Sequence, residues 1–163
     1  MADQLLLRRT NQEEVEFLVK IRMDFCSELH PEINPTTKND LERKTREYFQ
    51  KALRENSYRG YAGFLGDTLC CGAGVLIYSL PPWTEPLQRK CGHVLNFFVY
   101  PSFRKQGIGS RLMQYIIDDT TRDGFARLVL NATDAGERVY RKHGFHDPDD
   151  TSLILELHKP LSQ

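Results

Sequence analysis

Apolar residues recur at intervals of three or four positions in two long stretches of the first half of the chain, residues 10–30 and 39–55. That spacing is typical of amphipathic helices, which present one apolar face to a core. Thr10 and Glu13 have the spacing of a capping box, so we expect the first helix to begin there, and Pro31 should end it near the preceding residue. The core-facing side of the second helix is expected to consist of Leu41, Tyr48, Phe49 and Leu53.

Strands are indicated by short runs that are rich in β-branched and aromatic residues. Residues 5–8 predict a first strand, and residues 58–65 and 69–80 predict a hairpin with a turn at Gly66-Asp67. Residues 92–100 are apolar on both faces, which is typical of a strand that helices cover on both sides.

The second half of the chain predicts a loop over residues 102–106, a helix over 107–123, a strand over 127–132, a helix over 136–143 and a closing strand over 152–157. We therefore expect one domain, residues 1–163, with the order strand, two helices, three strands, helix, strand, helix, strand. This order predicts an α+β fold in which helices cover a mixed, mostly antiparallel sheet.

Charge and composition exclude several classes of partner. The chain of 163 residues carries 22 Lys and Arg against 22 Asp and Glu, so it lacks the basic surplus with which proteins bind nucleic acids or anionic membranes. No apolar run reaches the length of about 18 residues that a membrane span needs. The four cysteines have no Cys-x-x-Cys spacing, which indicates reduced thiols in a cytoplasmic protein. The histidines show no metal-ligand spacing, so no metal is expected.

The segment over residues 99–109 combines the end of a strand, a glycine-containing loop and the start of a helix. Free N–H groups at a helix N-terminus favour an anionic ligand, and Gly107 and Gly109 would let phosphate oxygens approach the backbone. Local positive charge comes from Arg104, Lys105 and Arg111. The loop lacks the Gly-Lys-Ser/Thr of a Walker-type site. From the residues alone, a tight turn into the helix explains the glycines equally well.

Two motifs in this region resemble those of the GNAT superfamily of acetyl-coenzyme A dependent N-acetyltransferases. Residues 104–109, Arg-Lys-Gln-Gly-Ile-Gly, match the family's Arg/Gln-x-x-Gly-x-Gly/Ala signature, between an apolar strand and a helix. Residues 140–145, Tyr-Arg-Lys-His-Gly-Phe, are similar to its Tyr-x-x-x-Gly-Phe element. The resemblance covers residues 92–145 and implies a GNAT-like fold of six to seven strands and about four helices, with the fourth and fifth strands splayed apart.

The resemblance implies that acetyl-CoA is the cosubstrate and assigns residues to it. The pyrophosphate would lie on backbone N–H groups of the loop and of the helix N-terminus. The pantetheine arm would run along the main chain at Phe98 and Val99, and an N–H near Phe97 or Phe98 would polarise the thioester carbonyl. Lesser contacts would come from Asn131 and Arg138. The residues assigned to the pyrophosphate site are Arg104, Lys105, Gln106, Gly107, Ile108, Gly109 and Ser110.

Tyr140 is the candidate general acid, because a phenol with a pKa of about 10 is protonated at neutral pH and is able to protonate the departing thiolate. The alternative for Tyr140 is an ordinary aromatic residue packed on the sheet. Asn96 and His93 are the candidates for handling the proton of the acceptor amine, and an unperturbed histidine has a pKa close to neutrality. The alternative for Asn96 is an ordinary hydrogen-bonded polar residue in an apolar strand, and the alternative for His93 is an ordinary histidine at the end of a strand.

The acceptor pocket is expected between the first two helices, residues 81–91 and the exposed side of the fourth strand. Acidic side chains there would attract a cationic amine, with solvated surface charge as the alternative for each of them. Tyr78 and Trp83 are expected to supply apolar walls, and Glu28 an acidic contact. The other acidic residues of this region are Asp24, Glu32 and Glu85.

We therefore expect an N-acetyltransferase that transfers the acetyl group of acetyl-CoA directly to a primary amine of a small molecule or to a free amino terminus. No nucleic acid or membrane partner is expected, and a homodimer is an open option because dimers are common in the resembling family. One alternative is an acyltransferase for a longer acyl chain, and another is a coenzyme-binding regulatory module without turnover. An acyl-enzyme on Cys91 or on the Cys70-Cys71 pair lacks an identifiable His and carboxylate partner.

Overall fold

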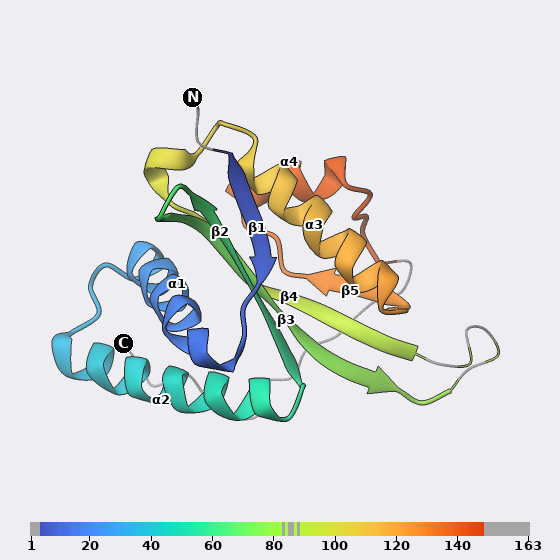
Figure 1. The fold of residues 1–163 in the computed structure, drawn as a ribbon, viewed down its shortest axis with the longest axis horizontal. Helices are drawn as coiled ribbons and strands as arrows, with labels where there is room; N and C mark the ends of the chain where they lie inside the picture. The colour runs from blue at the N-terminus through green and yellow to red at the C-terminus, as the bar shows by residue number, and fades with distance from the viewer. Residues whose placement is uncertain (1–3, 83, 85–86, 88, 149–163) are drawn as a thin grey trace.

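The strands form one open sheet. The computed structural model describes residues 4–82, 84, 87 and 89–148. Within them five strands lie in the order β1-β2-β3-β4-β5, all neighbours antiparallel except β4 and β5, which are parallel (Figure 1). The strands are β1 (Leu5–Arg9), β2 (Tyr58–Leu65), β3 (Thr68–Leu80), β4 (Arg89–Val99) and β5 (Arg127–Leu130). The predicted α+β class with a mostly antiparallel sheet is confirmed. The predicted closing strand over residues 152–157 lies outside the described residues, so five strands are described where six to seven were expected.

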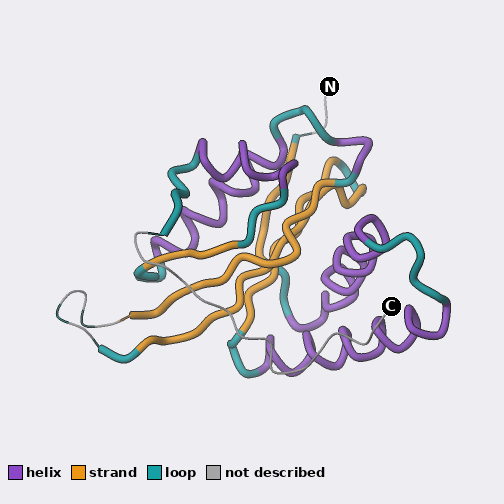
Figure 2. The backbone as a smooth tube through the Cα atoms, turned by 180° about the vertical axis from the view of Figure 1, so that it is seen from behind, coloured by secondary structure: helices purple, strands orange, loops and turns teal. Residues whose placement is uncertain are grey.

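Two pairs of helices cover the opposite faces of this sheet, α1 and α2 on one face and α3 and α4 on the other (Figures 1 and 2). Each face has its own apolar core. On the first face Val19 and Phe49 pack with Tyr58 of β2, and on the second face Leu112 and Ile116 lie in the core. The helices are α1 (Val15–Leu29), α2 (Pro35–Arg54), α3 (Ile108–Arg122) and α4 (Asp134–Lys142), which confirms the four predicted helices.

The predicted capping box at the start of the first helix is wrong by one residue. The N–H of Asn11 donates to the Glu14 carboxylate at 3.0 Å, and the Asn11 side chain accepts the N–H of Glu13 at 2.8 Å. Thr10 remains attached to the sheet, because its N–H donates to the carbonyl of Gly60 at 2.9 Å. Strand pairing thus extends further than the apolar pattern shows, and Asn11 is the first residue that is free to cap.

The second helix begins several residues earlier than predicted, at Pro35. Asn34 is its N-cap and accepts a backbone N–H of the first turn at 2.9 Å, and proline is favourable at the first helical position. The expectation that Tyr48 is buried is also wrong, since Tyr48 is 47% exposed while Thr45 and Ala52 are buried. The buried stripe of α2 therefore lies to one side of the stripe that the aromatic residues indicate.

Candidate active site

An opening separates β4 from β5 over the second half of β4. The two strands pair from Cys91 with Arg127 to Val94 with Leu130. β5 ends there, whereas β4 continues to Val99. The predicted splay of the fourth and fifth strands is thereby confirmed, and one side of β4 lacks a strand partner within the described part of the chain.

The open side of β4 presents backbone groups of Phe97 and Val99. The N–H of Tyr100 donates to a carbonyl of β3 at 3.0 Å. Because the backbone groups of successive strand residues point to opposite sides, those of Val99 and Phe97 point away from β3 into the opening. The Val99 carbonyl accepts Nε of Arg104 there at 2.8 Å. An extended ligand in the opening would thus meet Phe97 and Val99, whereas the backbone of Phe98, one of the predicted contacts, faces β3.

A bulge at Asn96 changes which residues of β4 face which side of the sheet. The register of β3 and β4 shifts between Gly72 and Gly74, so that one residue of β3 lies opposite two of β4. Asn96 has a φ of 54°, in the left-handed region that asparagine tolerates better than most residues. As a result, Leu95 and Asn96 both contact the α1 and α2 side, and Phe97 contacts the α3 and α4 side.

The loop before α3 has the geometry of an anion site. Lys105 and Gly107 have φ values of 61° and 77°, and these left-handed conformations turn the chain sharply into the helix. No side chain caps the helix, so the N–H groups from Ile108 to Ser110 have no acceptor among the described residues, at the positive end of the helix dipole. A Cβ atom at Gly107 would have no neighbour within 4 Å, so the space in front of the loop is open. The glycine turn is therefore what exposes the amides.

The cations predicted near this loop are only partly available to an anion. The Arg104 guanidinium forms an ion pair with Glu28 of α1 at 2.6 Å and lies over the ring of Phe98. Lys105 is exposed and has no carboxylate within 4.0 Å in the described ranges. Glu28, predicted as an acceptor contact, instead joins α1 to the loop.

The other predicted coenzyme residues make contacts within the protein or lie on its surface. Nε2 of Gln106 donates to the carbonyl of Ser102 at 3.1 Å. The Ser110 hydroxyl lies 2.8 Å from Nε2 of His143, which joins the start of α3 to the end of α4. Exposed side chains are found at Asn131 and Arg138. The backbone of the loop, more than its side chains, is thus free to bind a ligand.

Tyr140 of α4 lies beside the opening. The residue is 7% exposed, and its ring packs edge-on against Phe97 and Phe145 with centroid distances of 5.5 and 6.1 Å. Gly136 makes room for this ring, since a Cβ atom there would lie 2.8 Å from the Tyr140 hydroxyl oxygen. Burial raises the pKa of Tyr140 above its ordinary value, so the phenol stays protonated at neutral pH.

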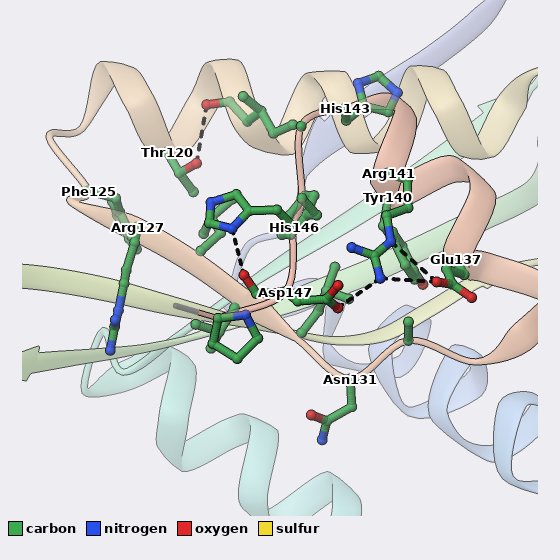
Figure 3. Close-up of a pocket in the computed structure, with 18 of the residues that line it drawn as sticks. Thr120, Phe125, Arg127, Asn131, Glu137, Tyr140, Arg141, His143, His146 and Asp147 are labelled. Carbon is green, nitrogen blue, oxygen red and sulfur yellow. Dashed lines mark hydrogen bonds and ion pairs between the residues drawn. The ribbon is translucent and has the colours of Figure 1, made fainter. Parts of the chain in front are cut away.

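A cavity of about 770 Å³ lies between α3, β5 and α4 (Figure 3). Tyr140 forms part of its wall, and Asn131 lies at the end of β5 beside it. Arg141 at its rim is bound to Glu137 and Asp147 at 3.2 and 2.8 Å. No residue of β4 or of the loop before α3 lines this cavity, but Tyr140 lies both in its wall and beside the opening between β4 and β5.

The two candidates for handling the amine proton occupy different environments. Asn96 accepts Nη1 of Arg22 at 2.7 Å and donates to the Tyr58 hydroxyl at 3.1 Å, so its oxygen and its nitrogen are each bound on the α1 and α2 side. His93 lies in the paired part of β4, and its Nε2 is buried with no partner among the described residues. Asn96 therefore borders the opening, and His93 does not.

Of the residues predicted to line an acceptor pocket, those that the structure describes do not come together. Tyr78 lies on β3 opposite the paired end of β4, remote from the bulge. Asp24 is bound to Lys20 and Tyr100, each at 2.8 Å. Trp83 lies outside the described residues.

A second cavity, of about 330 Å³, was missed by the sequence analysis. It lies on the α1 and α2 side of the bulge, and we call it the α1–α2 cavity. Its lining includes Arg22, Lys44, Tyr48, Tyr58, Leu95 and Asn96. Arg22 and Asn96 are 74 positions apart, so no local sequence signal brings them together.

The partly paired strands β4 and β5 and the uncapped N-terminus of α3 are the two features that the resemblance to the GNAT superfamily implies. The model of the acetyltransferase (GNAT) family matches residues 15–145, so the chain belongs to this family. A predicted acetyltransferase from Clostridium acetobutylicum, solved with acetyl-CoA, is 22% identical with a TM-score of 0.80, over 94% of this chain and 97% of that chain. A GCN5-related N-acetyltransferase from Ralstonia eutropha is 27% identical with a TM-score of 0.77, over 93% and 99% of the two chains. No curated protein matches the sequence.

Within residues 4–82, 84, 87 and 89–148, no group of three or more His, Cys, Asp or Glu side chains is placed to hold a metal ion. No helix in these ranges is long and apolar enough to cross a membrane. All four cysteines are free.

Proposed function

We propose that this protein is an N-acetyltransferase that transfers the acetyl group of acetyl-CoA directly to a primary amine of a small molecule or to a free amino terminus, with Tyr140 as the general acid. Membership of the acetyltransferase (GNAT) family supports acetyl transfer from acetyl-CoA. The observation that carries the proposal is the position of Tyr140, beside Phe97 at the opening that the free amides of α3 also face.

The residues present fit the coenzyme. The free N–H groups of Ile108 to Ser110 would bind the pyrophosphate, and the exposed ammonium group of Lys105 would add positive charge. The unpaired edge at Phe97 and Val99 would hold the pantetheine arm as an added strand. When bound, acetyl-CoA supplies an acyl thioester that an amine attacks.

Tyr140 is suited to protonate the leaving group. In the transfer, the bond from the amine nitrogen to the acetyl carbon forms, the bond from that carbon to sulfur breaks, and the sulfur leaves with the electron pair. A phenol kept protonated by burial would donate its proton to that sulfur. The N–H of Phe97, which points into the opening, would polarise the acetyl carbonyl.

The amine would enter from the α1 and α2 side, where Asn96 borders the opening. Asn96 has no titratable group, so its proposed role is to position its neighbours rather than to accept a proton. Because Nε2 of His93 is buried, we propose that the proton of the amine passes to water rather than to His93.

Release of free coenzyme A, followed with a thiol reagent, tests this function with acetyl-CoA and a panel of primary amines and peptides. We expect acetylated product by mass spectrometry with at least one amine. Tyr140→Phe should lower kcat by about 100-fold with little change in the KM for acetyl-CoA. Tyr115→Phe is the matched control, since Tyr115 is half-buried and its ring packs against that of the core residue Tyr61 with a centroid distance of 6.1 Å.

The alternatives give different results in the same assay. A regulatory module would bind acetyl-CoA without product, and an enzyme for a longer acyl chain would turn over butyryl-CoA faster than acetyl-CoA. Unchanged kcat in Tyr140→Phe would exclude the general-acid role.

A further inference from the structure

The α1–α2 cavity is the feature of the described residues that bears most directly on the acceptor. It lies against the bulge of β4, and Asn96 and Leu95 form its floor. The next residue, Phe97, contacts Tyr140 on the other side of the sheet. A molecule in this cavity would thus lie next to the opening through which an amine reaches the acetyl group.

Two cations face this cavity, and neither has a counter-charge among the described residues. Arg22 is half-buried and uses Nη1 for Asn96, and Lys44 is exposed at the rim. No carboxylate among the described residues lies within 4.0 Å of either cation. The half-buried Arg8, Arg46 and Arg59 do have such partners, as Arg46 has Glu16 at 2.7 Å.

Arg22 is held in place by neighbours that are themselves fixed. Asn96 accepts its Nη1 at 2.7 Å, and the Asn96 amide donates to the Tyr58 hydroxyl at 3.1 Å. Tyr58 is 3% exposed, and a Cβ atom at Gly74 would overlap its ring. The guanidinium is therefore oriented before any ligand arrives, and its remaining N–H donors have no partner within the described part of the chain.

Aromatic rings complete the cavity. Tyr48 packs edge-on against Phe49 and Tyr58 with centroid distances of 5.5 and 6.1 Å. Tyr48 is 47% exposed although it borders an apolar cluster, so part of its ring is available to a ligand. The cavity thus offers a cationic pair on one side and an apolar wall on the other.

We infer that the α1–α2 cavity binds an oxyanion of the acceptor, a carboxylate or a phosphate, so that the preferred substrate is a small amine that also carries an acidic group. This inference rests on the proposed acetyl transfer. A fixed guanidinium binds carboxylates and phosphates through paired N–H donors, and Lys44 adds a second positive charge. The expectation from sequence, that acidic residues attract a cationic amine, is thereby replaced: Asp24 and Glu28 are already bound to cations of the protein.

Matched acceptors test the inference. Each acid-bearing amine is compared with the same amine lacking the acid: L-phenylalanine with 2-phenylethylamine, and 2-aminoethyl phosphate with ethanolamine. We expect kcat/KM to be at least about 10-fold higher for the acid-bearing member of one pair, and the pair that responds identifies carboxylate or phosphate as the oxyanion.

Variants of the cations provide the second comparison. Arg22→Gln and Lys44→Gln should lower the ratio of kcat/KM for the acid-bearing acceptor to kcat/KM for the neutral amine, by about 10- to 100-fold for Arg22. Lys38→Gln, an exposed lysine of the same helix as Lys44, is the matched control and should change neither. Arg22→Lys keeps the charge and should retain part of the preference, which separates loss of charge from loss of folding.

A binding measurement separates this inference from the proposed function. The thermal shift produced by 3-phenylpropionate or by phosphate, measured without acetyl-CoA, should be lost in Arg22→Gln. Binding that depends on Arg22 with no acetylation of any amine would support the cavity and overturn the proposed function. Acetylation of neutral and acid-bearing amines at equal rates, unaffected by Arg22→Gln, would overturn the cavity assignment and leave the proposed function intact.

Discussion

Replacing Asp119 by asparagine perturbs the ion-pair cluster that ties α3 to β1 and β2. The carboxylate is buried and accepts Nε of Arg9 at 2.8 Å, Nη1 of Arg59 at 3.0 Å and the hydroxyl of Tyr61 at 2.8 Å. Asparagine has the same shape without the charge, and its NH₂ group would face guanidinium donors. Two arginines would thus lose a shared buried partner.

The magnitude follows from the exposure of the partners. Removing one member of a buried ion pair costs about 3–5 kcal/mol. The low end applies here, because the Arg9 side chain is 42% exposed and Asp123 also pairs with both arginines. We therefore expect the free energy of unfolding at pH 7 to fall by about 3 kcal/mol, and the Tm by about 6–12 °C for a chain of this size.

The effect of Asp119→Asn should depend on pH. Burial by itself raises the pKa of Asp119, but hydrogen bonds from Arg9 and Tyr61 and the charges of Arg9 and Arg59 outweigh it and hold the pKa below its ordinary value. A carboxyl group whose pKa is lower in the folded than in the unfolded protein stabilises the folded state fully above the unfolded pKa of about 4. This stabilisation is lost as the pH falls through the pKa of the folded protein. The difference between the two proteins should therefore be largest above about pH 5, begin to shrink below about pH 4 and vanish only below the folded pKa of Asp119.

Urea unfolding followed by circular dichroism, from pH 7 down to pH 3, measures this difference. Asp118→Asn is the matched control, since Asp118 is the preceding residue of α3, is exposed and, among the described residues, accepts only from Gln114 at 2.8 Å. The control should change the free energy of unfolding by less than about 0.5 kcal/mol. The reasoning would be refuted if Asp119→Asn did not lower the free energy of unfolding at pH 7, or if it lowered it as much at pH 3 as at pH 7.

Three glycine substitutions separate stability from activity. Gly107→Ala, at a φ of 77°, should lower the free energy of unfolding by about 1 kcal/mol and, because it strains the turn that exposes the amides, also raise the KM for acetyl-CoA several-fold in steady-state assays; an unchanged KM would argue against coenzyme binding at these amides. Gly124→Ala, at a φ of 72°, should lower the free energy of unfolding by about the same 1 kcal/mol but leave the kinetics unchanged. Gly136→Ala should displace the Tyr140 ring and lower kcat, although alanine favours the helix by about 1 kcal/mol, and an unchanged kcat would contradict a positional role for that ring.

Local patterns in the sequence predict the framework of this fold. The helices are found because apolar spacing is a local property, and the loop over residues 104–109 is found because left-handed turns select glycine. The capping box is misplaced because the end of a strand depends on its partner, here Gly60 of β2, which holds Thr10 in the sheet.

The charged residues of the site are where sequence reasoning fails. Arg22 and Arg104 look alike in the sequence, yet Arg104 is neutralised by Glu28, 76 positions away, whereas Arg22 faces a cavity. The bulge at Asn96 has no local signature in the sequence. In a regular strand Asn96 would face the side opposite to Leu95, but the bulge places both side chains on the α1 and α2 side. Ion pairs between residues that are distant in the sequence decide which cation is free to bind a ligand. The sequence alone does not distinguish the paired cations from the free ones.

The left-handed Asn96 has a consequence for engineering. The same residue forms the floor of the α1–α2 cavity and sets the direction in which the backbone of Phe97 and Val99 points. A β-branched residue at this position would favour a regular strand, at a cost of about 1–2 kcal/mol for keeping the bulge. Substitutions of Asn96 that change the acceptor preference would therefore also alter the backbone edge at Phe97 and Val99 that is proposed to bind the coenzyme. The specificities for acceptor and coenzyme cannot be evolved independently through Asn96.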